Sequence, residues 1–114
     1  PFQIAARGAL NIGEWWVAPP HHLNYFDFDS LSALLEGLGL TELERTTSFP
    51  MEAFLMMGEN YTSDPALGRD CHIRRKRFDF AMEIAGLREM RRNFYGALAA
   101  QGIGREAIII ATRP

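Results

Sequence analysis

Apolar residues recur with helical spacing in several stretches of this chain and alternate with polar residues in one. The clearest predicted helix spans residues 28–38, where Asp27 can cap the first turn and Gly39 can adopt the left-handed conformation that ends helices. Its apolar positions recur every three or four residues and form one face: Phe28, Leu31, Leu34, Leu35 and Leu38. This face needs a sheet to cover.

Two strands are predicted. Residues 41–49 alternate between two faces, one of them more polar, and Pro50 stops the strand. A second strand is predicted at residues 105–112, where the run Ile108–Ile110 is typical of a buried strand. The two could pair antiparallel, but two strands alone do not make a stable sheet. We therefore expect this chain to be the end of a larger α/β sheet.

A helical block at about residues 51–104 separates the two strands. It should open with a short apolar helix that ends at Gly58. Asp64 followed by Pro65 is a strong start signal for a long helix that continues to about Ala85. A further helix then carries one apolar stripe: Leu87, Met90, Phe94 and Leu98.

The segment before residue 27 has weaker signals. Residues 2–13 are compatible with a short helix that ends at Gly13, and residues 14–18 with a brief extended segment before Pro19 and Pro20. The chain contains no linker-like tract and no internal repeat. We predict one domain, residues 1–114, of a helix-rich α/β class.

Charge excludes some partners and leaves others open. The net charge of −2 and a pI of about 5.9 give no general attraction to nucleic acid or membranes. Eight of the twelve basic residues nevertheless lie between Arg69 and Arg92. On a helix they spread over more than one face, with acidic residues within reach for pairing. A solvated helix face is one interpretation, and a site for a phosphorylated or nucleotide-linked ligand is the other.

Cys71 is the only cysteine of the chain. A disulfide within the chain is therefore impossible, and no Cys/His spacing indicates a zinc site. A reducing cytoplasm is the expected setting. No apolar run approaches the roughly 20 residues that a membrane helix needs. Neighbouring arginines could lower the pKa of the Cys71 thiol, although no base partner is indicated.

The residues best suited to catalysis or substrate binding precede the predicted helix at 28–38, in "WWVAPPHHLNYF". An imidazole titrates close to neutral pH and is suited to accepting a proton. Polar side chains beside it could contact a substrate, and the tryptophans could form an aromatic wall. The alternatives are a solvated histidine pair and aromatic residues that pack against the helix start. The candidate site residues are His22 as a base, with His21, Asn24, Tyr25 and Trp16 as substrate contacts.

One family resemblance fits this order of segments. "WWVAPPHHLNYFDFDSLSALLEGLGL", a Thr-rich strand and the final "AIIIATRP" together resemble the C-terminal half of a class I S-adenosylmethionine-dependent methyltransferase. That family has a Rossmann-like sheet whose last helix and strand are followed by a strand inserted antiparallel to the others. The resemblance covers nearly the whole chain, and the helical insert at about 51–104 is its less typical part.

The resemblance implies a transferase that methylates a small-molecule acceptor such as a sugar. Related sugar-modifying enzymes carry a Glu-His-x-x-Tyr segment whose histidine is the proposed base. His22 matches that histidine, but His21 replaces the glutamate. No glycine-rich turn here follows a strand and opens a helix, so we expect the cofactor to be bound by an N-terminal half that this chain lacks.

A second reading needs no catalysis. The chain could be a small α/β interaction module whose uncovered sheet edge and apolar helices pair with another chain. Under either reading we expect a homodimer or another association through the exposed edge.

Overall fold

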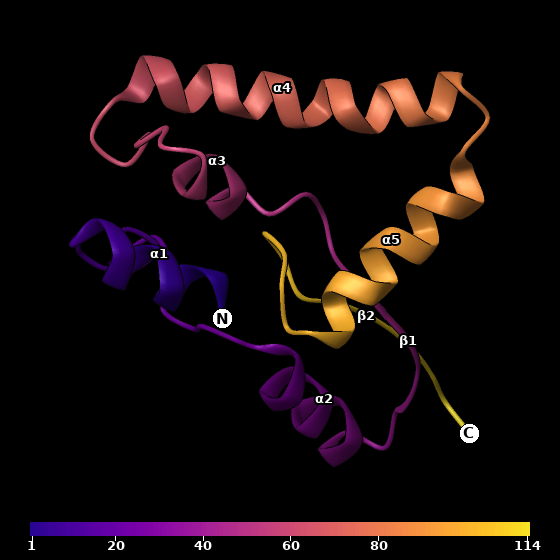
Figure 1. Cartoon of the computed structure of the whole chain (residues 1–114). Coiled ribbons are helices and arrows are strands. Elements are labelled where there is room, and N and C mark those ends of the chain that lie inside the picture. Colours follow the sequence, from indigo (N-terminus) through magenta and orange to yellow (C-terminus); the bar gives the residue numbers. More distant parts are fainter.

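The computed structural model describes all 114 residues and confirms a helix-rich α/β chain with two antiparallel strands (Figure 1). The elements follow in the order α1 (Phe2–Leu10), α2 (Phe28–Gly37), β1 (Thr41–Thr46), α3 (Glu52–Met56), α4 (Pro65–Ile84), α5 (Arg88–Ala100) and β2 (Ile108–Thr112). No helix is both long enough and apolar enough to cross a membrane.

The start of α2 is capped as predicted. The Asp27 carboxylate accepts a hydrogen bond from the Ser30 amide at 2.8 Å, and the Ser30 hydroxyl accepts one from the Asp27 amide at 3.0 Å. The Ser30 hydroxyl also donates to that carboxylate at 2.6 Å, and the two bonds from Ser30 to the carboxylate hold the pKa of Asp27 below its usual value because they favour the ionised form. Gly39 follows the helix with a positive φ of 76°.

The long helix α4 is also capped as predicted. The Asp64 carboxylate accepts hydrogen bonds from the amides of Ala66 and Leu67, and Pro65 occupies the first helical position. The helix ends at Ile84, one residue before the predicted end, and Gly86 has a φ of 73°. Local signals therefore located both long helices.

β1 and β2 pair antiparallel, with Thr46 opposite Ile108 and Thr41 opposite Thr112. A bulge between Glu42 and Glu44 interrupts the register. Both strands are shorter than the predicted 41–49 and 105–112. Beyond Thr46 the two segments are joined by the Thr47 hydroxyl, which donates to the Glu106 carbonyl at 2.6 Å, and by the Arg105 amide, which donates to the Ser48 carbonyl at 3.3 Å.

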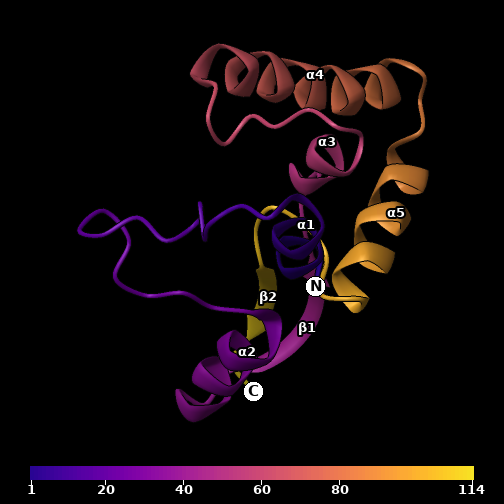
Figure 2. The same cartoon turned by 60° about the vertical axis from the view of Figure 1, so that its left-hand side comes forward.

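α2 and α5 lie on opposite sides of the strand pair (Figure 2). Glu42 of β1 points toward α2 and accepts a hydrogen bond from Ser32. Glu44 points toward α5 and pairs with Arg92 at 2.7 Å. The bulge separates the two glutamates onto different faces, because residues two apart on a regular strand would share one. The sheet is therefore a thin central layer between two helices.

The block that connects β1 to β2 projects from one end of the strand pair. α4 crosses above α3 and α5 in Figure 1, away from the strands. Three aromatic rings join it to its neighbours: Phe78 lies 5.3 Å from Phe49 and 5.9 Å from Phe94 between ring centroids. α3 and α4 thus lie beyond the carboxyl end of β1, whereas α5 runs back along one face of β1.

The prediction that Ile108–Ile110 form a buried strand is wrong for this chain. Ile108 and Ile110 are 38% and 48% exposed. Leu38, at the end of the apolar face of α2, is 69% exposed. The physical reason is the small sheet: α5 packs on β1 rather than β2, and a two-stranded layer is too narrow to cover α2 completely.

The whole chain buries less surface than a compact domain of its size. Its radius of gyration is 15.6 Å, against about 13 Å expected for a compact chain of this length. Its accessible surface is 7734 Å², against roughly 6,300 Å² expected from its mass. Only 12 residues are buried, so most of the apolar stripes read from the sequence remain uncovered on one side.

The N-terminal segment differs from its prediction. α1 ends at Leu10, three residues before Gly13, with Asn11 in the left-handed conformation at φ 50°. Residues 14–18, predicted to be extended, turn at the two tryptophans, where the Val17 amide donates to the Glu14 carbonyl at 3.0 Å. Local hydrogen bonding replaces an extended strand because no neighbouring strand is present to pair with it.

Candidate functional site

The histidine segment forms a loop between α1 and α2 that is held by its own hydrogen bonds. The Tyr25 hydroxyl accepts from the Ala18 amide at 2.8 Å and donates to the His22 carbonyl at 3.0 Å. The His22 amide donates to the Ala18 carbonyl at 3.0 Å. Tyr25 therefore closes the loop that presents the two histidines.

The structure brings some of the predicted site residues together. His22 and Tyr25 have ring centroids 6.5 Å apart, and Trp16 packs edge-on against Trp15 at 4.7 Å. His21, His22 and Asn24 are exposed. None of the five candidate residues lines the three main cavities. Within this chain they form a surface loop rather than an enclosed pocket.

The largest of these cavities, about 710 Å³, lies between α1, the start of α2 and the turn that leads into β2. Its walls carry both signs of charge, including Asp29 and Arg45, which pair at 3.2 Å. It opens near the carboxyl end of β1, which is also the amino end of the antiparallel strand β2. It is large enough for a small metabolite.

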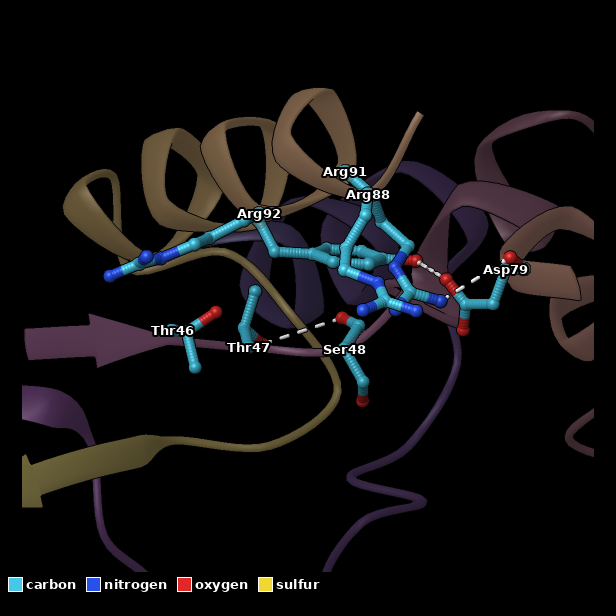
Figure 3. A pocket seen from close by; sticks show the side chains of 8 residues that line it. Thr46, Thr47, Ser48, Asp79, Arg88, Arg91 and Arg92 are labelled. Atoms are coloured by element: carbon cyan, nitrogen blue, oxygen red, sulfur yellow. Dashed lines mark hydrogen bonds between the residues drawn. The ribbon is translucent and has the colours of Figure 1, made fainter. Parts of the chain in front are cut away.

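A smaller cavity of about 290 Å³ lies where β1, α4 and α5 meet (Figure 3). Three arginines reach into it, and each has an internal partner. Arg92 pairs with Glu44, while Arg88 and Arg91 share Glu83. These pairs leave little unbalanced positive charge for an anion.

Tyr95 and Asp79 complete the smaller cavity. Tyr95 is buried and donates a hydrogen bond to the Asp79 carboxylate. Burial raises the pKa of Tyr95, and the bond to Asp79 raises it further. Together with the paired arginines, this arrangement indicates a joint that fixes the angle between α4 and α5.

Two of the basic residues on α4 have side-chain partners within the chain, and Arg69, Lys76 and Arg77 are exposed. Arg74 lies 2.5 Å from Glu59 and stacks over the ring of Phe54 at 4.8 Å. The Arg75 Nε–H donates to His72 Nδ1 at 3.1 Å. These contacts support the interpretation of this run as a structural helix face, and His72 as part of it.

Cys71 is fully buried, and burial raises the pKa of its thiol above the usual value. The nearby Arg74 opposes this shift but does not reverse it. The prediction that neighbouring arginines could lower the pKa is therefore wrong. Cys71 is a core residue, because desolvation outweighs the charges around it.

Sequence reasoning overlooked Glu52. The segment "MEAFLMMG" indicated only a short apolar helix, but its single acid is 4% exposed. Burial raises the pKa of Glu52. The signal that could have found it is the charge itself, because a lone acid in an otherwise apolar helix must be either turned outward or buried at a cost.

Comparisons with models of protein families, with curated proteins and with solved structures gave no significant match.

Proposed function

We propose that this chain is the C-terminal, acceptor-side part of an S-adenosylmethionine-dependent methyltransferase for a small molecule such as a sugar. The cofactor would be bound by an N-terminal half outside this chain. The chain would contribute the histidine loop, the last two strands of the sheet and the helical insert between them.

The observation that carries this proposal is the uncovered strand β2. It pairs with β1 on one side only, while Ile108 and Ile110 remain exposed beside its free edge. A free edge with apolar neighbours favours the addition of a further strand. The order of helix, strand and antiparallel strand is compatible with the family's last elements, and the helical insert between the two strands is the less typical part.

The position of the cavities is compatible with the acceptor side. The insert leaves β1 at its carboxyl end and returns to the start of β2, at the same end of the strand pair. In a larger parallel sheet, this would be the end at which α/β folds bind ligands. His22 would take a proton from the acceptor as the methyl group moves, and His21, Asn24, Tyr25 and Trp16 would contact the acceptor. In such a displacement, alignment supplies most of the acceleration.

A second candidate function is an interaction module without catalysis. The accessible surface area of this chain is larger than that of a compact domain of its size. This area and the exposed apolar residues on α2 and β2 favour association with another chain. A homodimer or an association through the free edge of β2 would satisfy the same observation.

Calorimetric titration with S-adenosylmethionine separates these functions. We expect no binding to residues 1–114 alone, because no glycine-rich turn between a strand and a helix is present, and clear binding to the full-length natural protein. Binding by the isolated chain would contradict the assignment of the cofactor to a missing half. Absence of binding by the full-length protein would favour the interaction module.

His22 has its own test in the full-length enzyme. Replacing His22 with alanine should slow turnover by about tenfold or more, as expected when a general base is lost, and should leave cofactor affinity unchanged. Leu23→Ala, at an exposed position on the same loop with no proposed role, is the matched control. Equal turnover in the His22 variant and the wild type would remove His22 from the mechanism.

A further inference from the structure

α4 carries apolar residues on two opposite faces. Its inner face buries Cys71 and Arg75 against the rest of the chain. At about 100° per residue, the opposite face carries Ile73, Phe80 and Ile84, which we call the outer row. Their exposed fractions are 51%, 66% and 71%. A helix that is apolar on both faces is expected where something covers the second face as well.

Three basic residues border the outer row. Arg69 and Lys76 lie on one side of it and Arg77 on the other, by the same helical spacing. All three are exposed, and none takes part in an ion pair of the chain. They differ in this from Arg74, which pairs with Glu59. The outer row therefore lies between unpaired positive charges.

No acidic side chain of α4 balances these charges. The helix has three acidic residues, and each is engaged elsewhere: Asp70 with Arg74, Asp79 with Tyr95, and Glu83 with Arg88 and Arg91. α4 also lies at the outside of the molecule, away from the strands (Figure 1). The outer face of α4 thus combines exposed apolar side chains with positive charge that nothing in the chain neutralises.

The sign of this charge decides between the possible occupants of the face. A second copy of the chain is disfavoured, because a two-fold contact centred on the outer row would bring Lys76 and Arg77 against their own copies. The occupant must be negatively charged at its surface and apolar below it. A bilayer surface that contains anionic lipids has both properties along the whole helix, whose length is about 30 Å. A protein groove would have to place three separate acids in register.

We propose that the outer face of α4 binds the surface of membranes that contain anionic lipids. The helix would lie parallel to that surface, with the outer row among the upper acyl chains and the basic side chains at the phosphate groups. The net charge of the chain is −2, but an attraction that fades over about 10 Å depends on the local charge of the face. The inference does not depend on the proposed methyl transfer.

The test measures binding of the full-length natural protein to lipid vesicles, by flotation and by calorimetric titration. We expect binding to vesicles of phosphatidylcholine and phosphatidylglycerol in equal parts, and no binding to vesicles of phosphatidylcholine alone. Binding should be lost in about 1 M salt, because electrostatic attraction is then screened within about 3 Å.

The contribution of the charges is measured with glutamine. Arg69→Gln, Lys76→Gln and Arg77→Gln together should weaken binding by about a hundredfold, because each Lys or Arg near an anionic surface contributes about fivefold. Arg113→Gln, at an exposed basic position near the C-terminal end of the chain, is the control and should leave binding unchanged.

The contribution of the outer row is measured with serine. Ile73→Ser, Phe80→Ser and Ile84→Ser together should weaken binding by about tenfold or more, because apolar side chains no longer leave water. Leu23→Ser, at an apolar position that is 79% exposed, is the control and should bind as tightly as the wild type. The melting temperatures of the serine and glutamine variants should stay close to that of the wild type, because the replaced side chains are exposed.

Three results would overturn the proposal. Absence of binding to the anionic vesicles would favour an acidic protein groove as the occupant of the face. Serine variants that bind as tightly as the wild type would show an attraction of charge alone. Serine variants that melt well below the wild type would show that the outer row is packed inside the natural protein and is not free to meet a membrane.

Discussion

Replacing Gly104 with alanine should destabilise the protein by about 3 kcal/mol or more, from backbone strain and overpacking together. Gly104 has a φ of 146°, which side chains rarely adopt, and a Cβ atom there would lie 1.6 Å from the Thr47 hydroxyl oxygen. That hydroxyl donates to the Glu106 carbonyl and ties the end of β1 to the turn before β2. The new methyl group must therefore displace the very residue that closes the strand pair.

Alanine substitutions at two other glycines separate the cost of backbone strain from the cost of a steric clash. Gly86 has a φ of 73° with nothing within 4 Å of a Cβ, so Gly86→Ala should cost only about 1 kcal/mol. Gly37 lies at the end of α2 with open space and no positive φ, so Gly37→Ala should be neutral or slightly stabilising. Urea unfolding of the three variants measures the order. A Gly104→Ala variant as stable as Gly86→Ala would show that the turn at 102–106 is not packed as described.

Ile110→Asp should destabilise the isolated chain only slightly and a longer protein with the proposed larger sheet much more. In residues 1–114 the side chain is 48% exposed, so the substitution should cost less than about 1 kcal/mol. If a further strand covers β2 in the full-length protein, Ile110 is buried there. An aspartate would then cost about 3 kcal/mol or more, because it buries an unpaired charge.

The comparison depends on a control at a site that the proposed further strand would not reach. Ile84 is the exposed last residue of α4, the helix that lies away from the strands in Figure 1, so Ile84→Asp should have a small effect in both proteins. Chemical denaturation of both variants in each protein, compared with the wild type of that protein, measures the loss of stability in each case. If Ile110→Asp is equally mild in both proteins, β2 is a true edge strand and the larger sheet does not exist.

The local elements were predictable because their signals are local. Asp27, the apolar spacing from Phe28 to Leu38 and Gly39 together define α2. Asp64 and Pro65 define the start of α4 in the same way. Such caps act within one helical turn and need no distant partner, so they function in any tertiary setting.

The antiparallel pairing of the strands was one of the few long-range features that the sequence indicated, since β1 and the Ile-rich segment were the only candidates. The strand ends were not predictable. Thr47 continues the alternation of β1, but it leaves the ladder because its hydroxyl reaches the Glu106 carbonyl, 59 residues further along the chain. The bulge at Glu42 and Glu44 likewise depends on the helices that face each glutamate.

Sequence by itself determined the helices, their caps, the two strands and the shortage of strands to cover them. Only the tertiary structure decided that Ile108 and Ile110 are exposed, that Cys71 is fully buried and that Glu52 is buried beside Tyr61. Burial depends on which distant segments pack over a residue. A pattern of spacing reports which face of an element is apolar, but it does not report whether this chain holds enough other surface to cover that face.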